Sequence, residues 1–160
     1  MLRISKLTDY ATALMTQLAA MPERQVSAQQ LATESRLPLP TVAALLKRLG
    51  RAGLVRGSRG VAGGYSLARP PKEISVAEVI AVIEGPVALT ECALGDGNCS
   101  LESDCVTRAN WRQISRAVQV ALEAVTLAEM AHPAARPVGK TVPRTVKFMP
   151  LKQPGLKESP

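Results

Sequence analysis

Aromatic residues are scarce in this chain of 160 residues, which contains one Trp, two Tyr and one Phe. With 46% hydrophobic residues, the core must be built from Leu, Val, Ile, Ala and Met, a composition that favours helices over a β-sandwich. No stretch approaches the roughly 18 consecutive apolar residues that a membrane span requires. The first residues, Met1–Lys6, also lack the apolar run of a signal peptide. We therefore expect a mainly α-helical, cytoplasmic protein that is neither membrane-bound nor secreted.

Histidine is nearly absent, since His132 is the only one in the chain. Neither a Ser–His–Asp arrangement nor a complete phosphate-binding loop is evident. We therefore expect that the protein is not an enzyme.

Acidic residues are few at both ends of the chain. Residues 1–70 contain ten Lys and Arg but three acids, a net charge of +7, whereas residues 71–131 contain four basic residues and nine acids, a net charge of −5. A basic first half beside an acidic segment suggests a polyanion partner for the first half alone. The alternative is a solvated charged surface.

Residues 132–160 differ from the rest, because they contain half of the 12 prolines, six basic residues and one acid. This segment has no helical or strand period, so it cannot bury enough apolar area to offset the ordering of its backbone. We predict a disordered basic tail that adds nonspecific affinity for nucleic acid or only solubility. The expected organisation is a head at 1–70, a second part at 71–131 that forms one continuous domain with the head, and this tail.

Three helices are predicted within the first 51 residues. The first ends before Pro22, the second opens with a capping box at Ser27–Gln30, and Pro40 suits the first turn of the third. Their apolar residues recur at helical spacing: Leu7, Tyr10, Ala11, Leu14 and Leu18, then Leu31 and Ala32, then Val42, Leu45, Leu46 and Leu49.

The outer face of the third helix has the chemistry to lie in the DNA major groove, because it is small, polar and basic and contains no acid. Short β-like runs at 54–57 and 64–67 then flank a Gly-rich segment, which predicts a wing. The segment lacks the signature of a nucleotide-phosphate loop. The sequence thus predicts a winged helix-turn-helix that binds double-stranded DNA. The candidate DNA-binding residues are Thr41, Lys47, Arg48 and Arg51 on the helix, and Arg56 and Arg59 in the wing.

All three cysteines of the chain, Cys92, Cys99 and Cys105, lie in one segment with the spacing C-x6-C-x5-C. The odd count and a reducing compartment disfavour structural disulfides. An iron–sulfur cluster suits soft thiolate ligands in a glycine-containing loop. A zinc site, a thiol redox switch and inert cysteines are the alternatives, although zinc usually has close cysteine pairs and four ligands.

Two further helices are predicted in the second part. Ser75–Glu78 is a capping box that opens a short helix ending near Gly85. After Cys105, one long helix is expected, and its apolar residues follow the a/d spacing of a helix that pairs along one seam. A homodimer seam is the preferred interpretation, and an ordinary core helix is the alternative. The apolar residues of this stripe are Trp111, Ile114, Val118, Ala121, Val125 and Ala128.

Taken together, the opening segment 2–11, the wing 55–69, the segment 74–80 and the cysteine triplet resemble the Rrf2 (Rrf-two) family of bacterial winged-helix regulators. That family includes IscR-like regulators and the nitric-oxide-sensing repressor NsrR. The resemblance covers about residues 1–131, and within the family it is strongest to regulators of the SUF iron–sulfur assembly operon. It implies a homodimeric transcription regulator whose [2Fe–2S] or [4Fe–4S] cluster is held by Cys92, Cys99 and Cys105, and which controls iron–sulfur assembly genes.

The fourth ligand varies within the family. IscR-like members have a His three residues past the third Cys, where this chain has Arg108. The nitric-oxide-sensing branch places an Asp in a Leu-Thr-Asp motif on the first helix, where it reaches the partner subunit's cluster, and the matching residue here is Asp9. The rivals are an exogenous thiol and the acids Glu91, Glu102 and Asp104.

Departures from the family pattern limit what the resemblance implies. Pro40 and Ala43 stand where IscR-like members have a Ser and an acid used in base discrimination, so the DNA sequence preference is not transferred. Two alternatives to cluster sensing also stay open. One is a metal-free thiol redox-sensing or nitric-oxide-sensing repressor of the same fold. The other is an iron–sulfur carrier or interaction module that uses the basic head for a protein partner.

Overall fold

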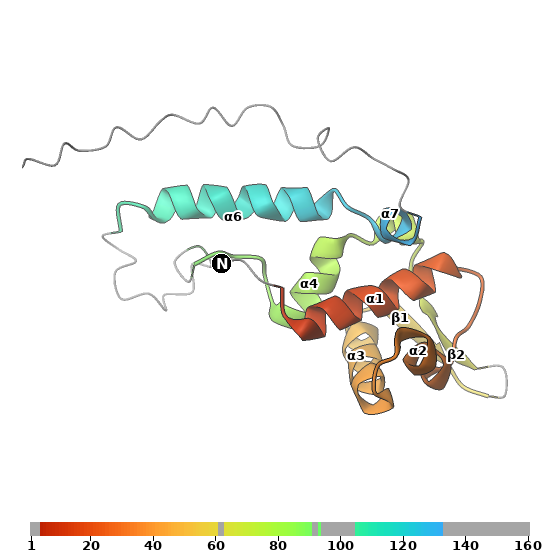
Figure 1. Cartoon of the computed structure of the whole chain (residues 1–160). Helices are drawn as coiled ribbons and strands as arrows, with labels where there is room; N and C mark the ends of the chain where they lie inside the picture. The colour runs from red at the N-terminus through yellow and green to blue at the C-terminus, as the bar shows by residue number, and fades with distance from the viewer. Residues whose placement is uncertain (1–3, 61–62, 91–92, 94–104, 133–160) are drawn as a thin grey trace, which may run out of the picture.

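The computed structural model describes residues 4–60, 63–90, 93 and 105–132, and Figure 1 shows how their elements are arranged. The protein is mainly helical with one small antiparallel sheet, which confirms the expected fold class. In chain order the elements are α1 (Lys6–Ala20), α2 (Ala28–Ser35), α3 (Leu39–Arg51), β1 (Val55–Ser58), β2 (Gly64–Leu67), η1 (Pro71–Glu73), α4 (Val76–Glu84), α6 (Arg108–Glu123) and α7 (Leu127–Ala131).

Side-chain caps begin the first two helices. The Ser5 hydroxyl accepts a hydrogen bond from the Thr8 amide at 3.2 Å, and Ser27 accepts one from the Gln30 amide at 3.1 Å. Both bonds satisfy amides that have no partner within the helix. The predicted capping box of α2 is only half formed, because the Gln30 side chain donates to Glu34 at 2.8 Å.

The turn between α2 and α3 depends on Arg36, whose φ of 56° lies in the left-handed region. Its amide donates to carbonyls near the end of α2, and Pro38 then caps α3 without a side-chain hydrogen bond. Pro40 lies in the first turn of α3, as predicted. The predicted buried stripe of α3 is confirmed: Val42, Leu45, Leu46 and Leu49 are each at most 1% exposed.

The predicted wing is an antiparallel hairpin in which Val55 pairs with Leu67 and Ser58 pairs with Gly64. Val26 adds one isolated bridge to the outer side of β2, through reciprocal backbone bonds with Tyr65 at 3.0 and 2.8 Å. Residues 61 and 62, which belong to the predicted wing tip, lie outside the described residues.

α4 and α7 close the core over α1. The capping box of α4 is complete, because Ser75 accepts from the Glu78 amide while the Glu78 carboxylate accepts from the Ser75 amide. Leu127 of α7 is fully buried, and its amide donates to the Ile74 carbonyl at 2.9 Å. The core is therefore aliphatic and links the helix-turn-helix to the segment that follows the wing.

The single long helix predicted after Cys105 is instead two helices, because α6 ends at Glu123 and α7 begins at Leu127. The break occurs at Thr126, which begins α7 with a capping box. Its hydroxyl accepts a hydrogen bond from the Glu129 amide, and the Glu129 carboxylate accepts one from the Thr126 amide. Only Ser115 of α6 is buried, and its hydroxyl accepts from the Leu89 amide at 3.1 Å. α6 therefore lies along the outside of the molecule, beyond α4 (Figure 1).

Within the described residues, no helix combines the length and the apolar composition that a bilayer crossing would need.

Candidate DNA interface and cysteine segment

The outer face of α3 presents the basic residues that the sequence assigned to it. Lys47 and Arg51 are exposed on the side of α3 away from the buried stripe, and Thr41 is half-buried at the flank of that stripe. No acid lies in the first turn of α3. The structure therefore leaves the cations Lys47 and Arg51 accessible to a duplex, with Thr41 to one side of them.

Arg48, the fourth candidate on α3, is engaged differently. Its Nη2 donates hydrogen bonds to the backbone carbonyls of Val82 and Ile83 at 3.1 and 2.9 Å. These carbonyls lie in the last turn of α4, so Arg48 holds the two helices together at that point.

The two candidate arginines of the wing lie at different distances from the hairpin tip. Arg56 lies in β1, exposed, and its Nε donates to the Ser66 hydroxyl of the neighbouring strand at 3.2 Å. Arg59 is exposed just beyond β1, next to Gly60, whose φ of 110° suits a reversal that a side chain would strain. Arg59 is therefore the outermost described basic residue of the hairpin.

The base of the wing is fixed to α4 by an ion pair. Arg69 Nη2 lies 2.6 Å from Glu78 Oε1. Partial burial raises the pKa of Glu78, but hydrogen bonds from the Arg69 guanidinium and the Ser75 amide outweigh it and hold that pKa below its usual value. Because both side chains are exposed, the pair orients the hairpin more than it stabilises the fold.

The first turn of α1 is tied to the end of α4. Glu84 Oε1 accepts hydrogen bonds from the Thr8 hydroxyl at 2.5 Å and the Ser5 amide at 2.9 Å. These bonds, first the one from Thr8, hold the pKa of the Glu84 carboxyl below its ordinary value of 4.5.

Asp9, the candidate fourth ligand, is exposed in this first turn of α1. Among the described residues, none pairs with its carboxylate by a hydrogen bond or ion pair. It lines an open pocket of about 340 Å³ together with Ile4, which precedes α1, and with residues of α1, α4 and α7: Lys6, Thr12, Val76 and Met130. An accessible carboxylate beside an open pocket is available to a ligand that approaches from outside.

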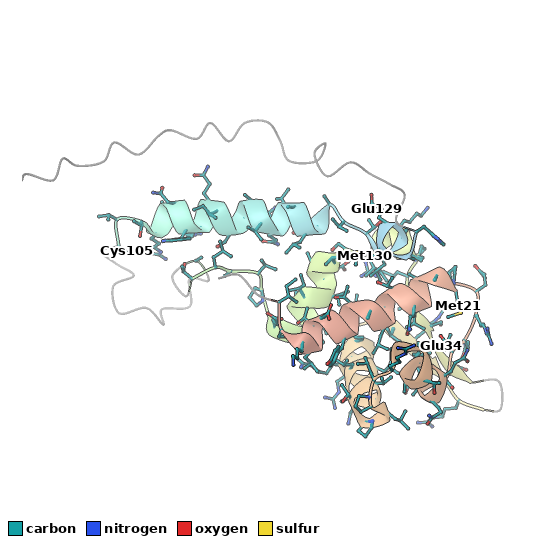
Figure 2. The ribbon with its side chains drawn as sticks, in the orientation of Figure 1. Met21, Glu34, Cys105, Glu129 and Met130 are labelled. Atoms are coloured by element: carbon teal, nitrogen blue, oxygen red, sulfur yellow. The ribbon has the colours of Figure 1, made fainter. Side chains whose placement is uncertain are left out.

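The cysteine segment is described only at its end. Cys105 is half-buried immediately before α6, and its Sγ lies 3.4 Å from the Thr107 hydroxyl. Figure 2 shows Cys105 at the end of α6 farthest from α7. Cys92, Cys99 and the rival acids Glu91, Glu102 and Asp104 lie outside the described residues, and the described part of the chain contains no metal-binding group of three or more His, Cys, Asp or Glu.

α6 exposes the apolar stripe that was predicted as a dimer seam. Trp111 is 38% and Ile114 is 44% exposed, although large apolar side chains are usually buried. Val125 lies beyond the end of α6 and Ala128 lies in α7, so the stripe on α6 itself is shorter than predicted.

Sequence reasoning missed two residues of this region. Leu39 is 39% exposed at the start of α3, where recognition helices contact base edges, and its flanking prolines are the signal that could have identified it. Glu84 gave no signal, because its partners Ser5 and Thr8 are distant in sequence.

Comparisons with known proteins agree with this architecture. The model of the family Rrf2, described as an iron-dependent transcriptional regulator, matches residues 4–133. An HTH-type transcriptional regulator of Mycobacterium tuberculosis is 37% identical over 132 residues, which cover 81% of each chain. The structure of CymR, the global cysteine regulator of B. subtilis, has a TM-score of 0.68 and 30% identity and covers 84% of this chain and 99% of that one. T. potens IscR has a TM-score of 0.64 and 32% identity over 81% of this chain and 85% of that one.

Proposed function

Because the chain belongs to the Rrf2 family of transcriptional regulators, we propose that it senses iron–sulfur cluster status and controls iron–sulfur assembly (SUF) genes. Its relatives are regulators rather than enzymes, and regulators of this fold bind DNA. The observation that carries the proposal is the pairing of an exposed basic recognition helix with a three-cysteine segment that leads directly into α6.

In the proposed DNA complex, α3 enters the major groove and the hairpin contacts the backbone or an adjacent minor groove. Thr41, Lys47 and Arg51 are the proposed contacts of α3 with the duplex: Thr41 is half-buried in the first turn, and the exposed cations Lys47 and Arg51 would meet the phosphates that flank the groove. Arg56 and Arg59 contact the duplex from the hairpin, where a guanidinium suits phosphate and narrow A·T-rich grooves.

The proposed regulator is a homodimer formed along α6. A second copy that covers Trp111 and Ile114 would remove from water apolar area that the single chain exposes. Two copies of α3 would then meet two half-sites of a palindromic operator, about one DNA turn apart.

The donor set fits an iron–sulfur cluster, since three thiolates are the ligands that such clusters use. Cys92, Cys99 and Cys105 would hold the cluster, which when bound would supply a centre sensitive to redox state, oxygen and nitric oxide. Asp9 is proposed as a ligand from the partner subunit. Its exposed carboxylate and the open pocket beside it support this role, because both are accessible to a group that approaches from outside the chain.

The experiment that tests this function uses anaerobically purified full-length protein. We expect visible absorbance, iron and acid-labile sulfide in the purified protein, all lost when Cys92, Cys99 and Cys105 are replaced by Ala. We also expect a shift of SUF promoter DNA whose affinity differs between the loaded and the metal-free protein. Protein that contains neither iron nor labile sulfide would refute cluster sensing.

A metal-free thiol sensor is the second candidate function. The fold similarity to CymR, named a global cysteine regulator, favours it, and Cys105 is the one candidate thiol that the described residues include. A colourless protein whose promoter affinity changes with oxidation and recovers with a reductant would support this candidate.

A further inference from the structure

The last turn of α4 is held by a residue from the recognition helix. The final carbonyls of a helix have no partner within the helix, and in α4 those of Val82 and Ile83 accept hydrogen bonds from Arg48 Nη2. α4 has no basic residue in its own last turn. Arg48 therefore supplies the cation that the negative end of the helix dipole favours.

The same turn of α4 also holds the beginning of α1. Glu84 accepts hydrogen bonds from the Ser5 amide and the Thr8 hydroxyl, and Ser5 is the N-cap of α1. The carboxylate thus lies at the positive end of the α1 dipole. One turn of α4 therefore fixes both the recognition helix and the first turn of α1.

We propose that Arg48 is a positioning residue, which sets the orientation of the recognition helix against α4 and does not contact DNA. This inference rests on the proposed DNA-binding function. Lys47 and Arg51 differ from Arg48, because neither makes a hydrogen bond or ion pair with another residue of the described part of the chain. Their charges are available to phosphate, whereas the end of the Arg48 side chain is occupied by α4.

The two roles predict different salt dependence. Each protein–phosphate contact releases counterions, so losing one contact lowers the slope of log affinity against log salt by about 0.9. A displaced recognition helix instead weakens base contacts, which reduces the affinity for the specific operator more than that for random DNA.

The test compares Arg48→Ala with the matched control Lys47→Ala in the full-length protein. The probes are an operator duplex that the wild-type protein selects from a random library, and a random duplex of the same length. Affinities are measured over a salt series well below the unfolding temperature, and thermal unfolding is measured without DNA. Arg48→Lys serves as a second variant, which keeps a cation near α4 if the Ala variant fails to fold.

For Arg48→Ala we expect operator affinity to fall about tenfold, comparable with one lost base contact, with random-DNA affinity changed less than about twofold. The salt slope should be unchanged, and the unfolding midpoint should fall by about 4 °C or more. Lys47→Ala should lower the salt slope, reduce the affinity for both duplexes and leave the unfolding midpoint unchanged. Arg48→Lys should fall between the wild-type protein and Arg48→Ala in both operator affinity and midpoint.

Three results would overturn the proposal. An Arg48→Ala variant that behaves like Lys47→Ala would make Arg48 a phosphate contact. A lower midpoint with wild-type operator affinity would make it only structural, and an unchanged midpoint would mean that it does not hold α3 at all. If the wild-type protein selects no DNA, the proposed function fails, while the unfolding midpoint still decides whether Arg48 anchors the helix.

Discussion

Gly64 and Val26 lie with their backbones in direct contact. A Cβ at position 64 would be 2.9 Å from the Val26 carbonyl carbon and oxygen, closer than packed atoms tolerate. This contact is adjacent to the bridge between Val26 and Tyr65, which attaches the hairpin to the chain before α2. Glycine at position 64 is therefore required by the close approach of two backbones.

The first prediction follows from this contact. Gly64→Ala forces the hairpin away from Val26, so the free energy of unfolding should fall by about 1–3 kcal/mol. Gly57→Ala is the matched control in the opposite strand, because its Cβ would meet only the Tyr65 ring, at 3.4 Å. It should change the free energy of unfolding by about 0.5 kcal/mol or less. Urea denaturation of both variants measures the difference, and equal effects would contradict the prediction.

Much of the fold was predictable from the sequence because its signals are local. The Ser75–Glu78 capping box, the buried stripe of α3 and the Gly-rich reversal of the hairpin depend on residues a few positions apart. The α6–α7 break was also encoded locally, in the capping box that Thr126 and Glu129 form. It was missed because the apolar spacing continues across the break.

The candidate site was less predictable, because its decisive contacts join distant parts of the chain. Helical spacing placed Arg48 on the outer face of α3, and it is exposed there. Its bonds to the end of α4 follow from how the two helices pack, which periodicity does not encode. The same holds for Glu84 and its partners Ser5 and Thr8 on α1.

The second prediction concerns the exposed apolar face of α6. Ile114→Glu places a charge on this face, and burying an unpaired charge between two subunits is strongly unfavourable. We expect the variant to be monomeric at concentrations where the wild-type protein is a dimer, by light scattering after size-exclusion chromatography. Gln113→Glu adds the same charge on another face of α6 and should leave the dimer intact. A dimeric Ile114→Glu protein would exclude this face as the seam.

The third prediction concerns the ligand role of Asp9. Asp9→Ala removes the accessible carboxylate of the α1 first turn, so the anaerobically purified variant should differ from wild type in its visible spectrum and cluster content. Glu23→Ala is the control, because it removes an exposed acid that lies beyond the end of α1. If Asp9→Ala keeps the wild-type spectrum and iron content, another group is the fourth ligand.

The fourth prediction is a pH dependence that originates at Glu84. Its pKa is lowered in the folded protein by hydrogen bonds from Thr8 and Ser5, so its contribution to stability is present above the ordinary value of 4.5. That contribution is lost as the pH falls through the lower folded-state pKa. Glu84→Gln should therefore be less stable than wild type at neutral pH and should lose less stability on acidification below about pH 4.5.

The measurement for Glu84 is chemical denaturation at a series of pH values. Glu23→Gln controls for the loss of one carboxylate and should follow the wild-type curve. Parallel curves for Glu84→Gln and wild type would show that the hydrogen bonds from α1 do not favour the ionised carboxylate.

The fifth prediction separates two roles for Arg59 at the tip of the hairpin. A guanidinium inserted into a minor groove is favoured where A·T tracts narrow that groove and deepen its negative potential, whereas a phosphate contact is indifferent to sequence. Arg59→Ala should therefore reduce affinity most for operators with A·T flanks and less for the same operators with G·C flanks. Arg56→Ala is the control in the same hairpin, because the Nε of Arg56 donates to the Ser66 hydroxyl and Arg56 lies in β1, farther from the hairpin tip than Arg59. An equal loss for Arg59→Ala on both operators would leave Arg59 as a phosphate contact only. The reason is that insertion into the minor groove makes the binding free energy depend on the A·T content of the flanks, whereas a phosphate contact does not.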